Sequence, residues 1–251
     1  MEIETLRKSY FDYVGTFKVD GKLPPMMELK RIHTGFVVKN ALEIAKGEGF
    51  EPHQTEICEA AALLHDTGRY EQLRRYNTFK DSDSVDHAVF SHDIVVEKGW
   101  LDDLPPADRD AILKAVLYHN RRDIPEGMPA LMDIASKTTR DADKLDIFRV
   151  LEHQVANTDW RRDSTAFWNL RYDLKPNPDV VDAIKSGRPV DYQNIKSLAD
   201  FVLIQVGWIR NGLYFETSRR LARERGHLEY RRKFILDLVG YDCSELFAFG
   251  A

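Results

Sequence analysis

The sequence predicts an all-α protein. Two observations carry this prediction: apolar residues recur at three- and four-residue spacing along most of the 251 residues, and no segment alternates apolar and polar residues as a half-buried β-strand does. Glycine and proline separate the periodic stretches, as they do where helices end. A chain of this length can bury a core without disulfide bonds, and it contains no internal repeat. The sequence therefore predicts a globular helical fold.

The first three predicted helices are separated by residues that break helices. Residues 2–18 place six apolar side chains on one helical face, and the Asp-Gly and Pro-Pro pairs of residues 20–25 follow them. A second helix is predicted from about residue 26 to residue 46, where two glycines stop it. A third helix begins after Pro52, carries a run of apolar residues and ends at Gly68.

The rest of the chain combines a loop, further helices and one irregular segment. Residues 76–86 are rich in Asn, Asp, Ser and Thr, which predicts a loop with Asp81 among its turn and capping residues. Residues 158–193 contain Asn, Pro and Gly, and we predict an insertion or cap there, before the final helices. No flexible linker flanks it, so we predict a single domain over residues 1–251, with a hinge to a small second domain as the alternative. Helices are predicted over the other periodic segments, residues 86–98, 106–119, 129–157, 194–216 and 217–239.

Composition and charge narrow the classes of function. Hydrophobic residues make up 43% and charged residues 31%, which is the balance of a soluble globular protein. The 36 basic and 41 acidic residues give a net charge of −5, which argues against duplex nucleic acid as a partner. No stretch approaches the roughly 18 apolar residues of a membrane span, and the first residues do not resemble a signal peptide. These features predict a cytoplasmic protein with no membrane partner.

Two local features are interpreted without a functional role. Cys58 and Cys243 lie far apart and in no metal-ligand spacing, which indicates two reduced thiols. Basic residues gather near the C-terminus, and we interpret them as a solvated helix face, with a surface for an acidic partner as the alternative. The residues of this basic cluster are Arg219, Arg220, Arg223, Arg225, Arg231, Arg232 and Lys233.

Six residues of metal-ligand type lie on different predicted helices or helix ends. Imidazole and carboxylate groups suit iron, manganese, zinc and nickel, and a helical bundle can direct such groups inward to one site. Any one of them alone also fits a packed or solvated side chain, so the prediction rests on the full set and its order. The six residues are His33, His65, Asp66, His87, His119 and Asp143.

The sequence around these residues resembles the HD-domain superfamily. LLHDTGRYEQL (residues 63–73) resembles the family signature, in which a helix ends in His-Asp followed by a small residue and Gly. RDADKLDIF (residues 140–148) resembles the later motif, in which an Asp after Ala completes the metal site. The resemblance covers roughly residues 28–150. It implies an HD-domain helical bundle with additional C-terminal helices and a metal-site core over about residues 26–157.

Two further stretches resemble the histidine motifs of HD proteins that have six metal ligands. DHAVFSHDIV (residues 86–95) selects His87 over His92, because His92 falls where the family usually has Ala. The two side chains would also point about 140° apart around a regular helix. AVLYHN (residues 115–120) resembles the helix end that supplies the next histidine, His119.

The resemblance implies one or two divalent metal ions, with manganese, iron, cobalt, nickel, magnesium and zinc as candidates. Asp66 would bridge the two ions. The other ligands of the first ion would be His33, His65 and Asp143, and those of the second would be His87 and His119. Two such cations can neutralise a phosphate together and lower the pKa of bound water to about 7.

Three residues are predicted to act in catalysis: Asp66, Arg69 and Lys144. Arg69 follows the metal-binding helix end, and the resemblance implies a phosphate ligand there. Lys144 follows Asp143 and could neutralise substrate charge. A surface cation or a structural salt bridge is the alternative for both. Asp146 shares a helix face with Asp143 and is a candidate to orient a ligand histidine.

The implied function is metal-dependent hydrolysis of a phosphoric ester or anhydride in a nucleotide or another small phosphorylated molecule. Two alternatives stay open: a diiron oxygenase of the HD type, which uses the same ligand set, and a nucleotide-binding sensor, against which the full ligand set argues. A cyclic-dinucleotide phosphodiesterase of the HD-GYP kind has paired histidines where this chain has His119-Asn120, which argues against that substrate. The oligomeric state is left open by the sequence, with a homodimer as one candidate.

Overall fold

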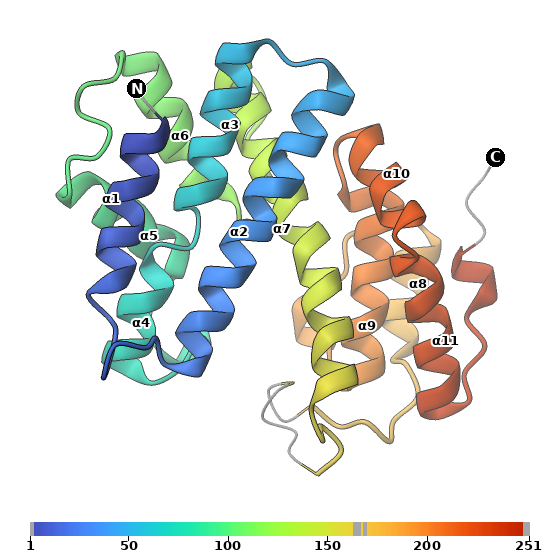
Figure 1. Ribbon diagram of the computed structural model, residues 1–251. Coiled ribbons are helices and arrows are strands. Elements are labelled where there is room, and N and C mark those ends of the chain that lie inside the picture. Colours follow the sequence, from blue (N-terminus) through green and yellow to red (C-terminus); the bar gives the residue numbers. More distant parts are fainter. Residues whose placement is uncertain (1–2, 163–166, 168–169, 248–251) are drawn as a thin grey trace. The chain divides into compact units, whose positions relative to one another are not determined.

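The computed structural model describes residues 3–162, 167 and 170–247, and within them the secondary structure is helical (Figure 1). No β-strand forms among these residues, which contain two isolated bridges, Val19 with Lys22 and Arg171 with Ser197. The predicted all-α fold is therefore confirmed. The chain forms two compact units, residues 1–146 and 147–251, and the single domain over residues 1–251 stays a prediction.

The first unit is built around a buried helix, α3 (Pro52–Leu64). Helix α3 contacts α1, α2 and α6, and α5 contacts both α4 and α6. Residues 57–64 of α3 are all buried, and its three successive alanines have short side chains that permit the neighbouring helices to approach closely. The other helices of this unit are α1 (Ile3–Gly15), α2 (Pro25–Glu48), α4 (Gly68–Tyr76), α5 (His87–Glu97), α6 (Pro106–Tyr118) and the first part of α7 (Ala130–Asn157), with a short 3-10 turn, η1 (Asp81–Asp83).

Local sequence accounts for the ends of these helices. Pro25 occupies the first turn of α2, where its missing N–H costs nothing, and Gly49 ends that helix with a φ of +71°. Asp86 caps α5, because its side chain accepts hydrogen bonds from the backbone N–H groups of Ala88 and Val89. These boundaries lie within two or three residues of the predicted ones.

Helix α4 was not predicted from the sequence. Gly68 begins this helix, whereas the sequence pattern predicted that Gly68 ends the preceding one. A Cβ at Gly68 would lie 2.6 Å from the backbone N of Ser91 and 2.9 Å from the carbonyl carbon of Phe90, so only glycine permits this approach to α5. The backbone N–H of Gly68 also donates to Ser91 Oγ at 2.9 Å. The contact places residues 65–67 in a tight turn between two helices.

The second unit contains the end of α7 and the helices that follow it, and two predicted helices are wrong in their extent here. Residues 217–239 form α10 (Glu216–Glu224) and α11 (His227–Val239), because Gly226 adopts a φ of +73° between them. The helix predicted over residues 194–216 is α9 (Leu198–Gly207), capped by Ser197, followed by a π-helical turn, η4 (Trp208–Gly212).

The segment predicted as an insertion or cap contains a helix, α8 (Pro178–Lys185), capped by Asn177, and a 3-10 turn, η3 (Tyr192–Asn194). Part of this segment, residues 163–166 and 168–169, lies outside the described residues. A last 3-10 turn, η5 (Ser244–Phe247), follows α11.

A buried arginine joins three helices of the second unit. Arg231, on α11, is fully buried and donates hydrogen bonds to Glu152 Oε1 on α7 at 2.7 Å and to Gln205 Oε1 on α9 at 2.8 and 3.0 Å. Its guanidinium also lies 4.6 Å from the ring centroid of Phe148. Because a buried charge is tolerated only when it is paired and hydrogen-bonded, this network specifies how α7, α9 and α11 pack.

The interpretation of the basic cluster as a solvated face agrees with α10 but is wrong for Arg231, which is fully buried because it pairs with Glu152 and Gln205. On α10, Arg219 and Arg223 pair with Glu216, and Arg220 pairs with Glu224. Both cysteines are buried and free of disulfide bonds. Among the described residues, no helix has an apolar stretch long enough to cross a membrane.

Replacing Gly68 by alanine tests the close approach of α4 to α5. We expect Gly68→Ala to lower the free energy of unfolding by about 1 to 3 kcal/mol, since the added methyl group must displace backbone atoms of α5. Gly35→Ala is the matched control, because a Cβ at Gly35, within α2, meets nothing within 4 Å. That change should stabilise the helix by roughly 0.5 to 1 kcal/mol. Urea unfolding of the metal-free proteins measures both, and equal effects would contradict the argument.

Candidate metal centre

The six predicted ligands come from five segments of the first unit. Those segments are the middle of α2, the turn after α3, the first residue of α5, the residue after α6, and the interior of α7. Five of the six side chains are buried, and Asp143 keeps 16% of its side chain exposed. The structure brings all six together although they span 111 residues of sequence, from His33 to Asp143.

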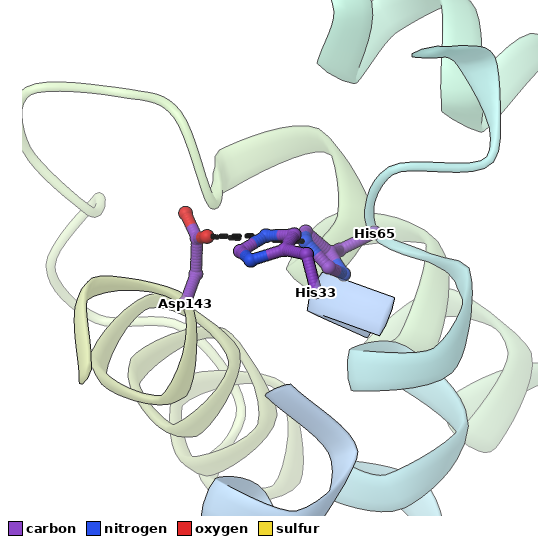
Figure 2. Close-up of side chains that lie close together, drawn as sticks. All are labelled: His33, His65 and Asp143. Atoms are coloured by element: carbon purple, nitrogen blue, oxygen red, sulfur yellow. Dashed lines mark hydrogen bonds and ion pairs between the residues drawn. The ribbon is translucent and has the colours of Figure 1, made fainter. Parts of the chain in front are cut away.

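One cluster consists of His33, His65 and Asp143, whose side chains point toward one another in Figure 2. The Nε2 atoms of His33 and His65 lie 3.4 Å apart. Asp143 Oδ1 lies 3.1 Å from His33 Nε2 and 3.9 Å from His65 Nε2. Three possible ligand atoms from three segments of the chain therefore lie within 4.8 Å of one another, close enough to bind one metal ion.

A second cluster consists of His87, His119 and Asp66. The Nε2 atoms of the two histidines lie 3.0 Å apart, and each lies 3.7 Å from Asp66 Oδ1. Both histidines sit at helix ends: His87 is the first residue of α5, and His119 directly follows α6.

Asp66 lies between the two clusters. Its Oδ2 atom is 3.5 Å from His65 Nε2 and 3.7 Å from His33 Nε2, while its Oδ1 atom faces His87 and His119. Oδ1 is buried and accepts no hydrogen bond from the described residues. A carboxylate with one oxygen toward each cluster has the geometry of a bridging ligand.

The outer nitrogen of each histidine has a hydrogen-bond acceptor. His65 Nδ1 donates to the carbonyl oxygen of Ala62, and His119 Nδ1 donates to that of Val116, both at 2.7 Å. His33 Nδ1 lies 2.6 Å from Asp146 Oδ2, the contact expected of Asp146. His87 Nδ1 lies 2.5 Å from Asp81 Oδ2. Each cluster thus combines one histidine backed by a carbonyl and one backed by a carboxylate: His65 and His33 in the first, His119 and His87 in the second.

These contacts test whether the residues fit a metal ion. When Nδ1 carries the proton of a neutral imidazole, the lone pair lies on Nε2. The Nε2 atoms of His87 and His119 then face each other at 3.0 Å with no proton between them, an arrangement that a cation stabilises. Two nitrogens bound to one ion at about 2.0–2.1 Å are themselves roughly 3 Å apart. The donor atoms and the unpartnered Oδ1 of Asp66 fit divalent ions at both clusters.

The protonation states support the same conclusion. Burial lowers the pKa of His65 and of His87 to about 4, so both are neutral at pH 7, the form that binds metal. Burial and the Lys30 cation lower the pKa of His33, but hydrogen bonding to Asp143 and Asp146 more than offsets them, and the net direction is upward. Without metal, His33 therefore retains a proton more readily than the other two.

Two cations hold Asp66 in its ionised form. Lys30 Nζ lies 2.7 Å from Asp66 Oδ2, and Arg69 Nε lies 3.4 Å from Asp66 Oδ1. Burial alone would raise the pKa of Asp66, but Lys30, His65 and Arg69 hold it well below its usual range. Asp66 is therefore a carboxylate at neutral pH in spite of its burial.

Arg69 links the metal site to the loop before α5. Its Nη1 atom donates to Gln72 Oε1, to the carbonyl oxygen of Phe79 and to Asp81 Oδ1, at 2.6 to 2.9 Å. Asp81 accepts from Arg69 through one oxygen and contacts His87 through the other. Burial raises the pKa of Asp81, but His87 and Arg69 lower that pKa by a larger amount, so Asp81 stays ionised.

Lys144, predicted to neutralise substrate charge, is buried. Burial and the nearby Arg140 lower the pKa of its ammonium group to about 7.

His92 lies outside both clusters, half-exposed, with its Nδ1 atom 2.9 Å from Asp93 Oδ1. Asp81, Asp86 and His87 form a third group of possible metal ligands. Its carboxylates already have other partners, because Asp86 caps α5 and pairs with Arg121, and Asp81 pairs with Arg69.

Two residues of the site were missed by the sequence interpretation. Lys30 lies three residues before His33, close to one helical turn, so its spacing was the available signal. Asp81 was interpreted as a turn residue, and a loop of varied conformation offers no spacing rule that would pair it with His87.

Comparison with known proteins agrees with this geometry. The HD domain family model matches residues 31–147, a range that contains all six residues of the two clusters. No curated protein matches the chain. Residues 31–147 are therefore similar in sequence to the HD domain family. HD domains bind divalent metal ions, and most members of the family are metal-dependent hydrolases.

Removing the Asp81 carboxylate tests its role as the support of His87. We expect Asp81→Ala to weaken binding of the second ion about 10- to 100-fold, because His87 loses the group that orients its ring. Asp81→Asn keeps an acceptor and should have a smaller effect. Manganese stoichiometry at limiting metal, measured by mass spectrometry, should fall from two ions per chain toward one.

Asp83→Asn is the control for this change, since Asp83 is exposed in the same loop and pairs with Lys80. An Asp81→Ala protein that binds manganese as well as the wild type does would contradict the role of Asp81. Equal loss of both ions would contradict its assignment to the second cluster.

Proposed function

We propose that this protein is a metal-dependent phosphohydrolase that acts on a nucleotide or another small phosphorylated molecule. The observation that carries the proposal is the position of Asp66, with one carboxylate oxygen toward each pair of histidines. The match of residues 31–147 to the HD domain family model supports the same class of reaction.

In this proposal, His33, His65, Asp66 and Asp143 hold one divalent ion, and Asp66, His87 and His119 hold another. Such ions supply a bound water whose pKa falls from ~15.7 to ~7, and they neutralise charge on phosphoryl oxygens. The second cluster has only three protein donors among the described residues, which leaves room for water or substrate.

The donor set favours some ions over others. Four imidazole nitrogens and two carboxylates suit manganese, iron, cobalt, nickel or zinc. Magnesium prefers oxygen ligands and retains several waters, so it is the least suited of the six candidates.

The chain's own residues prepare the site for this chemistry. Asp66 remains ionised, and the acceptors on the outer nitrogens direct each Nε2 atom inward. The three acceptors of Arg69 Nη1 support a role in holding Asp81 and Asp66 in place. The proposed contact of Arg69 with phosphate would have to use its other nitrogens. Lys144 follows Asp143 in the sequence and is buried, and it would neutralise negative charge of the substrate from that position.

Replacing Asp66 tests the site and the reaction together. We expect Asp66→Ala to lose both ions and to lower kcat/KM more than roughly 100-fold, since changes to outer hydrogen-bond partners alone cost 10- to 100-fold. Metal content is measured on the purified proteins, and phosphate release on a panel of nucleotides and phosphomonoesters with manganese, cobalt or nickel. Asp103→Ala, an exposed aspartate before α6, is the control.

Each outcome of these measurements has a distinct meaning. A wild-type protein that holds no metal and cannot be loaded would contradict the metal site. A loaded protein that releases no phosphate but consumes oxygen with reduced iron would identify the oxygenase alternative. A loaded protein that binds nucleotides without converting them would identify the sensor.

A further inference from the structure

Lys30 reaches the metal site from its solvent-accessible side. Its Nζ atom lies 2.7 Å from Asp66 Oδ2, and 19% of its side chain is exposed, compared with 3% for Asp66. The other cation on this carboxylate, Arg69, is farther away, at 3.4 Å from Oδ1. Lys30 thus connects solvent with Asp66, the more buried of the two carboxylates in the clusters.

The oxygen that Lys30 contacts is also the one that faces His65 and His33. A metal ion held by these residues would place a second positive charge on the same oxygen. Two cations so close together repel, and the repulsion is strong in a poorly hydrated site. Lys30 ends in a compact ammonium on a flexible four-carbon stem, so it can turn from Asp66 to an incoming anion.

The other cations of the site are less suited to this role. Arg69 already donates to three acceptors through Nη1. Lys144 is buried, with 7% of the residue exposed. Lys30 has one hydrogen-bond partner among the described residues, Asp66, together with a contact to the ring of Phe79, whose centroid lies 5.6 Å from Nζ.

Phe79 lies near both cations that pair with Asp66. The ring is half-buried and lies 5.6 Å from both Lys30 Nζ and Arg69 Cζ.

From this arrangement we infer that Lys30 binds a non-bridging phosphoryl oxygen of the substrate, exchanging Asp66 for the phosphate when metal is bound. The inference rests on the proposed function and names the group that recognises the charge of the substrate. An ammonium bound to a phosphoryl oxygen selects a phosphate with free oxygens, and it favours phosphomonoesters and terminal phosphates over fully esterified ones.

The test compares Lys30→Met, Lys30→Arg and wild type, each loaded with manganese. Inorganic phosphate is the probe, and its dissociation constant is measured by calorimetry. We expect Lys30→Met to retain its manganese and to bind phosphate about 10- to 100-fold more weakly, the range of a charged hydrogen bond. Lys30→Arg should keep most of the affinity. Lys39→Met is the matched control, since Lys39 is an exposed lysine of the same helix.

Two results would overturn the inference: phosphate binding by Lys30→Met at wild-type strength, or loss of manganese from that variant, which would make Lys30 a support of Asp66. Calorimetry requires no turnover, so the proposed function is judged separately. Phosphate binding that depends on Lys30 in a protein that hydrolyses no ester would sustain the inference and refute the phosphohydrolase. Hydrolysis by the wild type, together with unchanged phosphate binding in Lys30→Met, would support the phosphohydrolase and refute the inference about Lys30.

Discussion

The candidate metal centre depends on the burial of one ionised carboxylate, Asp66, between two pairs of imidazole nitrogens. A buried carboxylate is costly unless opposite charges and hydrogen bonds compensate it. Lys30 and Arg69 provide that compensation without metal, and they keep the group ionised and ready for cations. Much of the surrounding packing serves this arrangement, because the six residues of the two clusters come from five separate segments that must be held in place.

Rigidity comes from backbone geometry and from hydrogen bonds behind the ligands. The turn between α3 and α4 presents His65 and Asp66, and Gly68 allows that turn to press against α5. Carbonyls and carboxylates fix the outer nitrogens, so the inward nitrogens need little reorganisation to bind an ion. Asp81 extends this support into the loop before α5 and joins Arg69 to the second cluster.

Much of the fold followed from periodicity, and the exceptions have physical causes. Helix α4 has a polar sequence with few apolar residues and a glycine at its start, so its local pattern resembles a loop. The long helices predicted near the C-terminus are interrupted at Gly226, which adopts a positive φ, and at a π-helical turn that the apolar pattern does not indicate. Arg231, interpreted as part of a solvated basic face, is instead the buried centre of the second unit.

The sequence by itself determined the helical class, because apolar periodicity is a local property of the chain, and the resemblance of its motifs to the HD-domain superfamily selected the six residues of the two clusters. Only the tertiary structure decided which oxygen of Asp66 faces which pair of histidines. It also decided that Lys30 and Asp81 belong to the site. Contacts between side chains on separate helices and loops depend on how those segments pack, and no local spacing encodes that packing.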